Sequence, residues 1–117
     1  RYFVARILQF QFHKSLCILA NEYDPQDPAK PLHKCDIYQS TEAGNAMRSM
    51  LELGASKPWP ETLKSLTGVD HMDAGAIREY FKPLELWLED DNRKHGEHIG
   101  WEADDIYCDS TKESHLK

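Results

Sequence analysis

The sequence lacks the features of two common classes of protein. It has no basic excess, because 14 Lys and Arg stand against 20 Asp and Glu, and the net charge is −6. Nucleic-acid binders need clustered basic residues to displace phosphate counterions, so we expect no nucleic-acid partner. It also lacks a long uninterrupted apolar run. Polar and charged side chains break the most apolar stretch, residues 2–20, and we therefore expect no membrane span within this chain.

The zinc-peptidase motif His-Glu-x-x-His does not occur in the chain. The nearest pattern is His95-Gly96-Glu97-His98, in which two imidazoles three residues apart could touch one metal on a helix. Gly96 weakens such a helix, and histidines near a helix end interact favourably with its dipole. We therefore interpret His95 and His98 as solvated side chains and predict no metal ligands in this chain.

Cysteine is scarce, with three residues in 117. Cys17, Cys35 and Cys108 with His33 could be counted as a four-ligand zinc set, but their spacing is unlike that of a paired-ligand zinc finger. Cys17 and Cys35 could instead form a disulfide or stay as free thiols. Closing a loop of that length is worth about 3 kcal/mol in the chain-entropy model. Cys108 would then be free or would pair outside this chain.

Several breaker residues divide the chain into four predicted helices, with no convincing sheet. Residues 9–12 alternate like a strand, but the first segment has no Gly or Pro up to Asp24-Pro25, and its length favours a helix. The first predicted helix runs from Arg1 to about Tyr23, and the second is capped by Ser40 and stopped by Gly54. The third is Glu61–Thr67, with Pro60 in its first turn and Gly68 after it. The fourth is capped by Asp73 and ended by Gly96 or Gly100.

The last predicted helix has an apolar face and a charged face. We expect Ile77, Tyr80, Phe81, Leu84 and Leu88 to point inward, and Glu79, Lys82, Glu85 and Glu89 to point outward.

We expect the chain to be a piece of a longer protein. At 117 residues the chain allows one domain, and its apolar opening at Arg1 differs from the polar, frayed start of most domains. We expect one helical unit over residues 1–104 and an acidic, mobile tail over residues 105–117.

One polar stripe runs along the first predicted helix. Its members are Tyr2, Arg6, Gln9 and His13, which fall within about 60° of one another at 100° per residue. Such a stripe faces water, a cavity or another polar surface. On these grounds alone, Tyr2 is an ordinary packed aromatic residue and Arg1 an ordinary surface charge.

Several blocks of residues, in the same order, resemble one family. They are Arg1-Tyr2-Phe3-Val4, Gln9-Phe10-Gln11-Phe12-His13, residues 31–38 with Ser40 and Ala43-Gly44, residues 56–61, Tyr80-Phe81-Lys82-Pro83-Leu84 with Trp87-Leu88, and Gly100-Trp101. Together they are similar to the angiotensin-converting enzymes, the peptidyl-dipeptidase A type of zinc metallopeptidase. Within that family the sequence resembles the invertebrate members. It covers about residues 1–101.

This resemblance implies the fold and the activity of the parent protein. The fold would be the C-terminal part of a largely helical peptidase with a deep central cleft. Zinc would be held by an upstream His-Glu-x-x-His motif and a later glutamate, and the parent would release C-terminal dipeptides from oligopeptides. This chain alone would be inactive and would need the upstream remainder of the catalytic domain. The alternatives are a single-residue carboxypeptidase of the same family, and a catalytically dead homologue that acts as a binding module.

The resemblance also implies roles for individual residues. Tyr2 matches the tyrosine that donates a hydrogen bond to the developing oxyanion, and Arg1 matches the arginine that binds the activating chloride. Cys17 and Cys35 match a disulfide of the family. Arg6 departs from the aromatic residue of mammalian members near the substrate pocket, which puts the side-chain preference there in doubt. The disulfide implies an extracellular protein, either secreted or shed from a membrane-anchored precursor.

Overall fold

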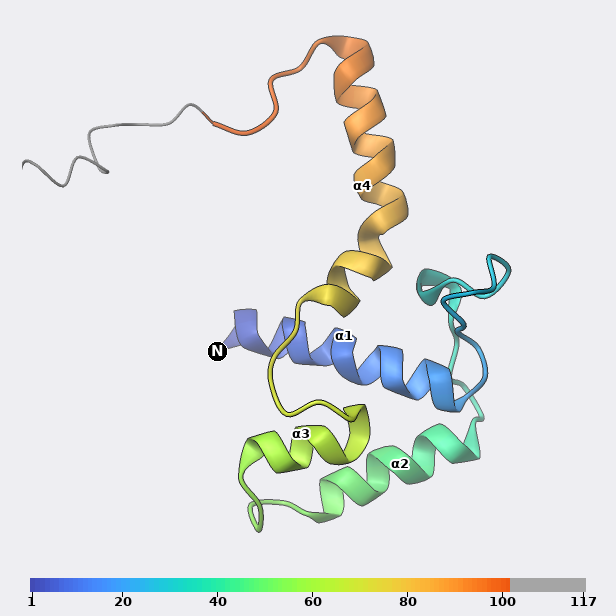
Figure 1. The fold of residues 1–117 in the computed structure, drawn as a ribbon, viewed down its shortest axis with the longest axis vertical. Coiled ribbons are helices and arrows are strands. Elements are labelled where there is room, and N and C mark those ends of the chain that lie inside the picture. Colours follow the sequence, from blue (N-terminus) through green and yellow to red (C-terminus); the bar gives the residue numbers. More distant parts are fainter. Residues whose placement is uncertain (102–117) are drawn as a thin grey trace, which may run out of the picture. The chain divides into compact units, whose positions relative to one another are not determined.

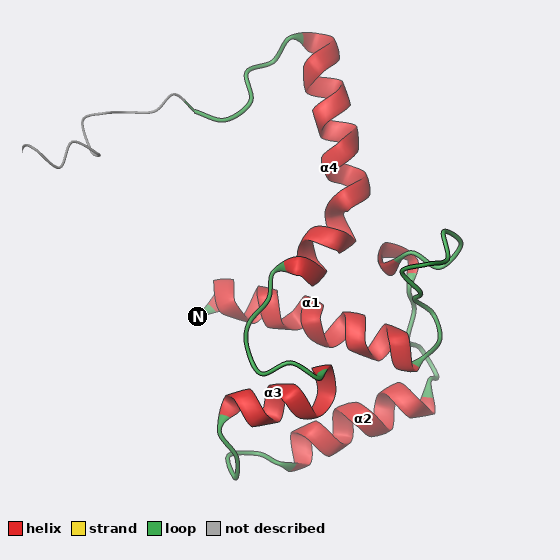
Figure 2. Cartoon of the chain, viewed as in Figure 1, coloured by secondary structure: helices red, strands yellow, loops and turns green. Residues whose placement is uncertain are grey.

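The described part of the chain is entirely helical. The computed structural model describes residues 1–101, in which four α-helices and one short 3-10 helix occur and no strand is present (Figure 2). The predicted all-α class with four helices is confirmed. The elements are α1 (Tyr2–Leu19), η1 (Leu32–Lys34), α2 (Thr41–Glu52), α3 (Trp59–Thr67) and α4 (Gly75–His95).

Helix α1 ends at Leu19, four residues before the predicted end at Tyr23. The chain leaves the helix through Asn21, which adopts a left-handed backbone with φ 57°. Asn tolerates this conformation better than most residues do. The turn lets Tyr23 fold back and become buried, at 5% exposure, beside Cys17. Burial of this aromatic ring therefore outweighs the helical pattern at the end of α1.

The predicted caps of α2 and α3 are present. Ser40 Oγ accepts a hydrogen bond from the Ala43 N–H at 3.2 Å, as an N-cap does. Gly54 after α2 and Gly68 after α3 have positive φ angles of 52° and 78°, a backbone conformation that glycine adopts most readily. Helix α3 begins two residues earlier than predicted, at Trp59, so Pro60 still lies in its first turn.

The first three α-helices share one apolar core. Figure 1 shows α1, α2 and α3 lying side by side, and they contact one another in every pairing. The core consists of Leu16 from α1, Ala43 and Met50 from α2, and Leu66 from α3, each at most 8% exposed. Phe12 and Ala20 also pack against this core, so α2 and α3 hold the C-terminal half of α1.

A second, smaller cluster fixes the loop between α1 and α2. It contains Cys17, Tyr23 and Leu32, and Leu32 is only 2% exposed. Leu32 opens η1, which was not predicted because a three-residue helix leaves no periodic pattern in the sequence. The packed side chains of this cluster therefore hold the proline-rich loop in place.

Helix α4 only partly follows the two predicted faces. Asp73 Oδ1 accepts a hydrogen bond from the Gly75 N–H at 2.8 Å before the helix, and Gly96 follows its end. Tyr80 and Phe81 contact Phe10 of α1, with ring centroids 5.0 and 5.6 Å apart. Within the described chain, however, three of the residues predicted to face inward are more than 40% exposed, namely Phe81, Leu84 and Leu88.

Glu79 was predicted to face outward, and that prediction is wrong. Its side chain is half-buried and is bound by Lys14 and Tyr23. A carboxylate can leave solvent when a cation and a hydroxyl donor satisfy it, which the pattern of α4 alone cannot reveal.

The chain divides into two units after Glu85. The first is Arg1–Glu85, which holds both apolar clusters, and of the second the structure describes residues 86–101. The predicted boundary at residue 104, the acidic tail at residues 105–117 and Cys108 all lie outside the described residues.

Across residues 1–101, none of the helices combines the length and the apolar character that crossing a membrane requires.

Candidate functional site

Two residues singled out by the sequence lie together at the start of α1. Arg1 is the N-cap residue, and its carbonyl accepts a hydrogen bond from the Ala5 N–H at 3.0 Å. The Arg1 guanidinium carbon lies 5.5 Å from the centroid of the Tyr2 ring, which is within cation–π range. Tyr2 is 76% exposed, so the fold of residues 1–101 leaves its side chain open to solvent.

The polar stripe of α1 separates into an exposed part and a half-buried part. Arg6 Nη1 donates to Gln9 Oε1 at 2.9 Å, and both side chains are exposed. His13 is half-buried, with its ring 5.9 Å from that of Tyr80. Arg6 stands four residues after Tyr2, and therefore on the same side of the helix.

A groove runs along α1 beside this stripe. Its volume is about 510 Å³, and it is lined by Ala5, Leu8, Gln9, Phe10, Phe12, His13, Leu16, Met47 and Tyr80. The stripe residues Gln9 and His13 border it, whereas Arg1, Tyr2 and Arg6 are not among its lining residues. Within the unit Arg1–Glu85, the groove and the Arg1–Tyr2 pair are therefore separate features of one helix.

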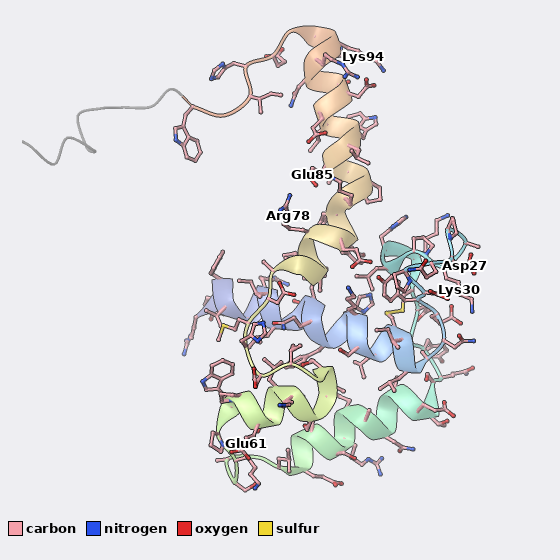
Figure 3. All side chains as sticks on the ribbon, viewed as in Figure 1. Asp27, Lys30, Glu61, Arg78, Glu85 and Lys94 are labelled. Carbon is pink, nitrogen blue, oxygen red and sulfur yellow. A yellow bond between two sulfur atoms is a disulfide. The ribbon has the colours of Figure 1, made fainter. Side chains whose placement is uncertain are left out.

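Cys17 and Cys35 form a disulfide, as the resemblance implied, with their Cα atoms 6.0 Å apart (yellow bond in Figure 3). It joins α1 to the residue that follows η1. Cys17 is fully buried, at 0% exposure, against Tyr23 and Leu32. The four-ligand zinc set with His33 is therefore not available in this state, because two of its sulfur atoms are bonded to each other.

The two histidines of the C-terminal pattern lie in the second unit and are exposed. His95 Nδ1 lies 2.9 Å from the Asp91 carbonyl oxygen one turn earlier, and it donates to that oxygen when it carries the proton. It is also 3.5 Å from an Asp91 carboxylate oxygen. Both contacts lie within the last turns of α4, where His95 is exposed to solvent. In the same unit Lys94 pairs with Asp90, and Figure 3 labels Lys94 on this helix.

Sequence reasoning missed a charged group inside the first unit. Lys14 Nζ lies 2.7 Å from Glu79 Oε2, and the Tyr23 hydroxyl donates to Glu79 Oε1. Burial alone would raise the pKa of Glu79, but hydrogen bonds from Lys14 and Tyr23, with the Lys14 charge, hold it below its usual range. Burial, then the hydrogen bond to Glu79 and its charge, raise the pKa of Tyr23. Separations of more than 50 residues hide this group from any local pattern.

A buried amide was also missed. Gln11 is 5% exposed, and its Nε2 donates to the His71 carbonyl at 3.1 Å while its Oε1 accepts from the Asp73 N–H at 3.1 Å. This amide ties the middle of α1 to the loop between α3 and α4. It therefore fixes the start of α4 against the helix that carries the candidate site.

Comparison with known proteins gives the same family as the resemblance in the sequence. The family model described as "Angiotensin-converting enzyme", of a peptidase family, matches residues 1–101. Angiotensin-converting enzyme of Mus musculus is 54% identical over 101 residues, which cover 86% of this chain and 7% of that protein. That of Haematobia irritans exigua is 55% identical over 89 residues, or 76% of this chain and 15% of that protein.

A third relative carries a different name. The angiotensin-converting enzyme-related protein of Drosophila melanogaster is 45% identical over 101 residues, or 86% of this chain and 16% of that protein. The chain thus spans between 7% and 16% of the length of these three relatives.

Proposed function

Because this chain belongs to the angiotensin-converting enzyme family, we propose that residues 1–101 form the C-terminal helical part of a zinc peptidase domain that releases dipeptides from the C-terminus of oligopeptides. Two exposed neighbours on the first turn of α1, Arg1 and Tyr2, carry this proposal. The rest of the catalytic domain would supply the groups that this chain lacks, and the chain alone would cleave nothing.

Tyr2 acts as a hydrogen-bond donor in this proposal. Its phenol donates to the carbonyl oxygen of the scissile peptide as negative charge develops there, and such a donor is worth about 3 kcal/mol in the transition state. The role requires a hydroxyl that is not already engaged in a hydrogen bond within the fold. The 76% exposure of Tyr2 in this chain supports that requirement.

Arg1 holds a chloride ion in this proposal, and Arg6 lies near the substrate pocket. The Arg1 guanidinium stands 5.5 Å from the Tyr2 ring, so an anion on Arg1 would be close enough to affect the position of the phenol. Arg6 lies one turn further along the same side of α1. Its charge would favour an acidic group on the bound peptide.

Residues 1–101 do not fit the catalytic zinc of the family. The sequence has no His-Glu-x-x-His motif, and the one group of three His, Cys or acidic residues with ligand atoms close together in residues 1–101 includes both disulfide cysteines. The family is one of zinc metallopeptidases, and the proposal places its zinc ligands elsewhere in the full-length protein.

The disulfide supports an extracellular location. Disulfides form and persist in oxidising compartments, and the Cys17–Cys35 bond is packed into a buried cluster. We place the full-length protein outside the cell, either secreted or shed from a membrane-anchored precursor.

Replacing one hydroxyl tests the role of Tyr2. In the full-length enzyme, Tyr2→Phe lowers kcat about a hundredfold and leaves KM nearly unchanged, because the lost bond forms only in the transition state. Tyr38→Phe is the matched control, since Tyr38 is 79% exposed and lies in the loop before α2. Equal kcat values for the two variants would refute the role.

Mass spectrometry of the products separates the competing activities. Release of intact dipeptides supports the proposal, whereas release of single residues identifies the carboxypeptidase alternative. A full-length protein that binds peptide and releases nothing, with no His-Glu-x-x-His motif upstream, would instead be a binding module.

A further inference from the structure

An imidazole lies against the disulfide, and the proposed peptidase function does not use it. His13 Nε2 and Nδ1 are 3.5 and 3.7 Å from Cys17 Sγ. The two residues are four apart on α1, so the helix itself keeps their side chains on one face. His13 is half-buried beside Tyr80, and Cys17 is fully buried.

Cys35 completes a group of three potential metal ligands. One ligand atom from each of His13, Cys17 and Cys35 lies within 4.8 Å of the other two. No second group of this kind occurs in residues 1–101. Cys35 follows η1, whose first residue, Leu32, packs in the same cluster as Cys17, so packing as well as the disulfide holds the two cysteines close.

The distance between His13 and Cys17 matches what a tetrahedral zinc ion requires of two of its ligands. Zn–S bonds of about 2.3 Å and Zn–N bonds of about 2.0–2.1 Å at tetrahedral angles place sulfur and nitrogen ligands about 3.6 Å apart, and two sulfurs about 3.8 Å apart. The His13–Cys17 distances already meet the first value. The two sulfurs are bonded to each other in the fold, and they would have to move apart, which side-chain rotation can supply once the bond is broken.

We propose that reduction of the Cys17–Cys35 disulfide creates a binding site for a thiophilic divalent metal, zinc above all, whose ligands are His13, Cys17 and Cys35. A dithiol reductant transfers two electrons and two protons, so that the S–S bond becomes two thiols while the reductant forms its own disulfide. Binding of the metal then releases the two thiol protons, and His13 ligates as the neutral imidazole.

The fold supplies the rest of the site. Zinc with three protein ligands keeps its fourth position for water, and the partial exposure of His13 and Cys35 leaves an approach for one. None of its three ligands is a residue to which we assign a part in the peptidase activity. It stands on local contacts in the first unit, so it does not depend on the proposed activity.

Cobalt(II) and zinc(II) titrations test the site in the full 117-residue chain carrying Cys108→Ser, which leaves two thiols. The chain is reduced with a dithiol, the reductant is removed without oxygen, and cobalt(II) is added. We expect one equivalent of cobalt to bind with thiolate-to-cobalt charge-transfer absorption, and one equivalent of zinc to displace it. The disulfide-bonded chain shows no such absorption, and circular dichroism follows the helix content throughout.

His13→Gln and His33→Gln form the decisive pair. His33 is two residues from Cys35, so an unfolded chain would chelate through it, whereas the folded site uses His13. We expect His13→Gln to weaken zinc binding by at least about tenfold and His33→Gln by less than about threefold. Equal loss in both variants, loss only in His33→Gln, or equal binding by the disulfide-bonded chain would overturn the proposal.

Discussion

Replacing Gln11 tests how the structure connects α1 to the start of α4. Gln11→Met keeps an unbranched side chain of similar length but removes the hydrogen bonds to the His71 carbonyl and the Asp73 N–H, both of 3.1 Å. Each net hydrogen bond is worth about 1 kcal/mol. His71 and Asp73 are exposed, so water can replace the lost partner of the His71 carbonyl and of the Asp73 N–H. The larger penalty for leaving a buried polar group without a hydrogen bond therefore does not apply to them. The expected loss of unfolding free energy is therefore about 1–2 kcal/mol.

Urea denaturation of the full chain, followed by circular dichroism, measures this loss. Gln9→Met is the matched control, because Gln9 lies on the same helix, is exposed, and bonds only to the Arg6 side chain among the described contacts. We expect Gln9→Met to change the free energy of unfolding by less than about 0.5 kcal/mol. If the two variants are equally stable, the buried amide does not tie the two segments together, and the reasoning fails.

Two further changes probe the first unit. The pKa of Glu79 is lowered in the fold from its ordinary value of 4.5, so its contribution to stability is complete above about pH 4.5 and is lost as the pH falls through the lower folded value. Urea midpoints between pH 2.5 and 6 should therefore vary less in Glu79→Gln than in the parent, and equal slopes would contradict this. Replacing both Cys17 and Cys35 by Ala should lower the free energy of unfolding by about 3 kcal/mol, since the two are 18 positions apart in the sequence. A loss under about 1 kcal/mol would show that packing alone closes the loop.

Local chemistry determined most of the helix boundaries. Ser40, Gly54 and Gly68 act within one or two turns of their own positions, so a cap or a left-handed glycine can be read from neighbouring residues. The end of α1 was misplaced because burial of Tyr23 depends on Leu32, which no local rule connects to it. The same limit applies to the exposure of Leu84 and Leu88, because an apolar period indicates a face without saying what covers it.

The sequence by itself determined the all-α class, the family, and the candidate residues Arg1, Tyr2, Cys17 and Cys35, since these follow from short motifs in a recognisable order. Only the tertiary structure decided which distant side chains meet. It brought Glu79 of α4 to Lys14 and Tyr23, and the amide of Gln11 to the loop at residues 71–73. It also placed His13 beside the Cys17–Cys35 disulfide, whose pairing the resemblance had implied. Contacts between residues far apart in the chain arise from packing of whole helices, and no local spacing encodes them.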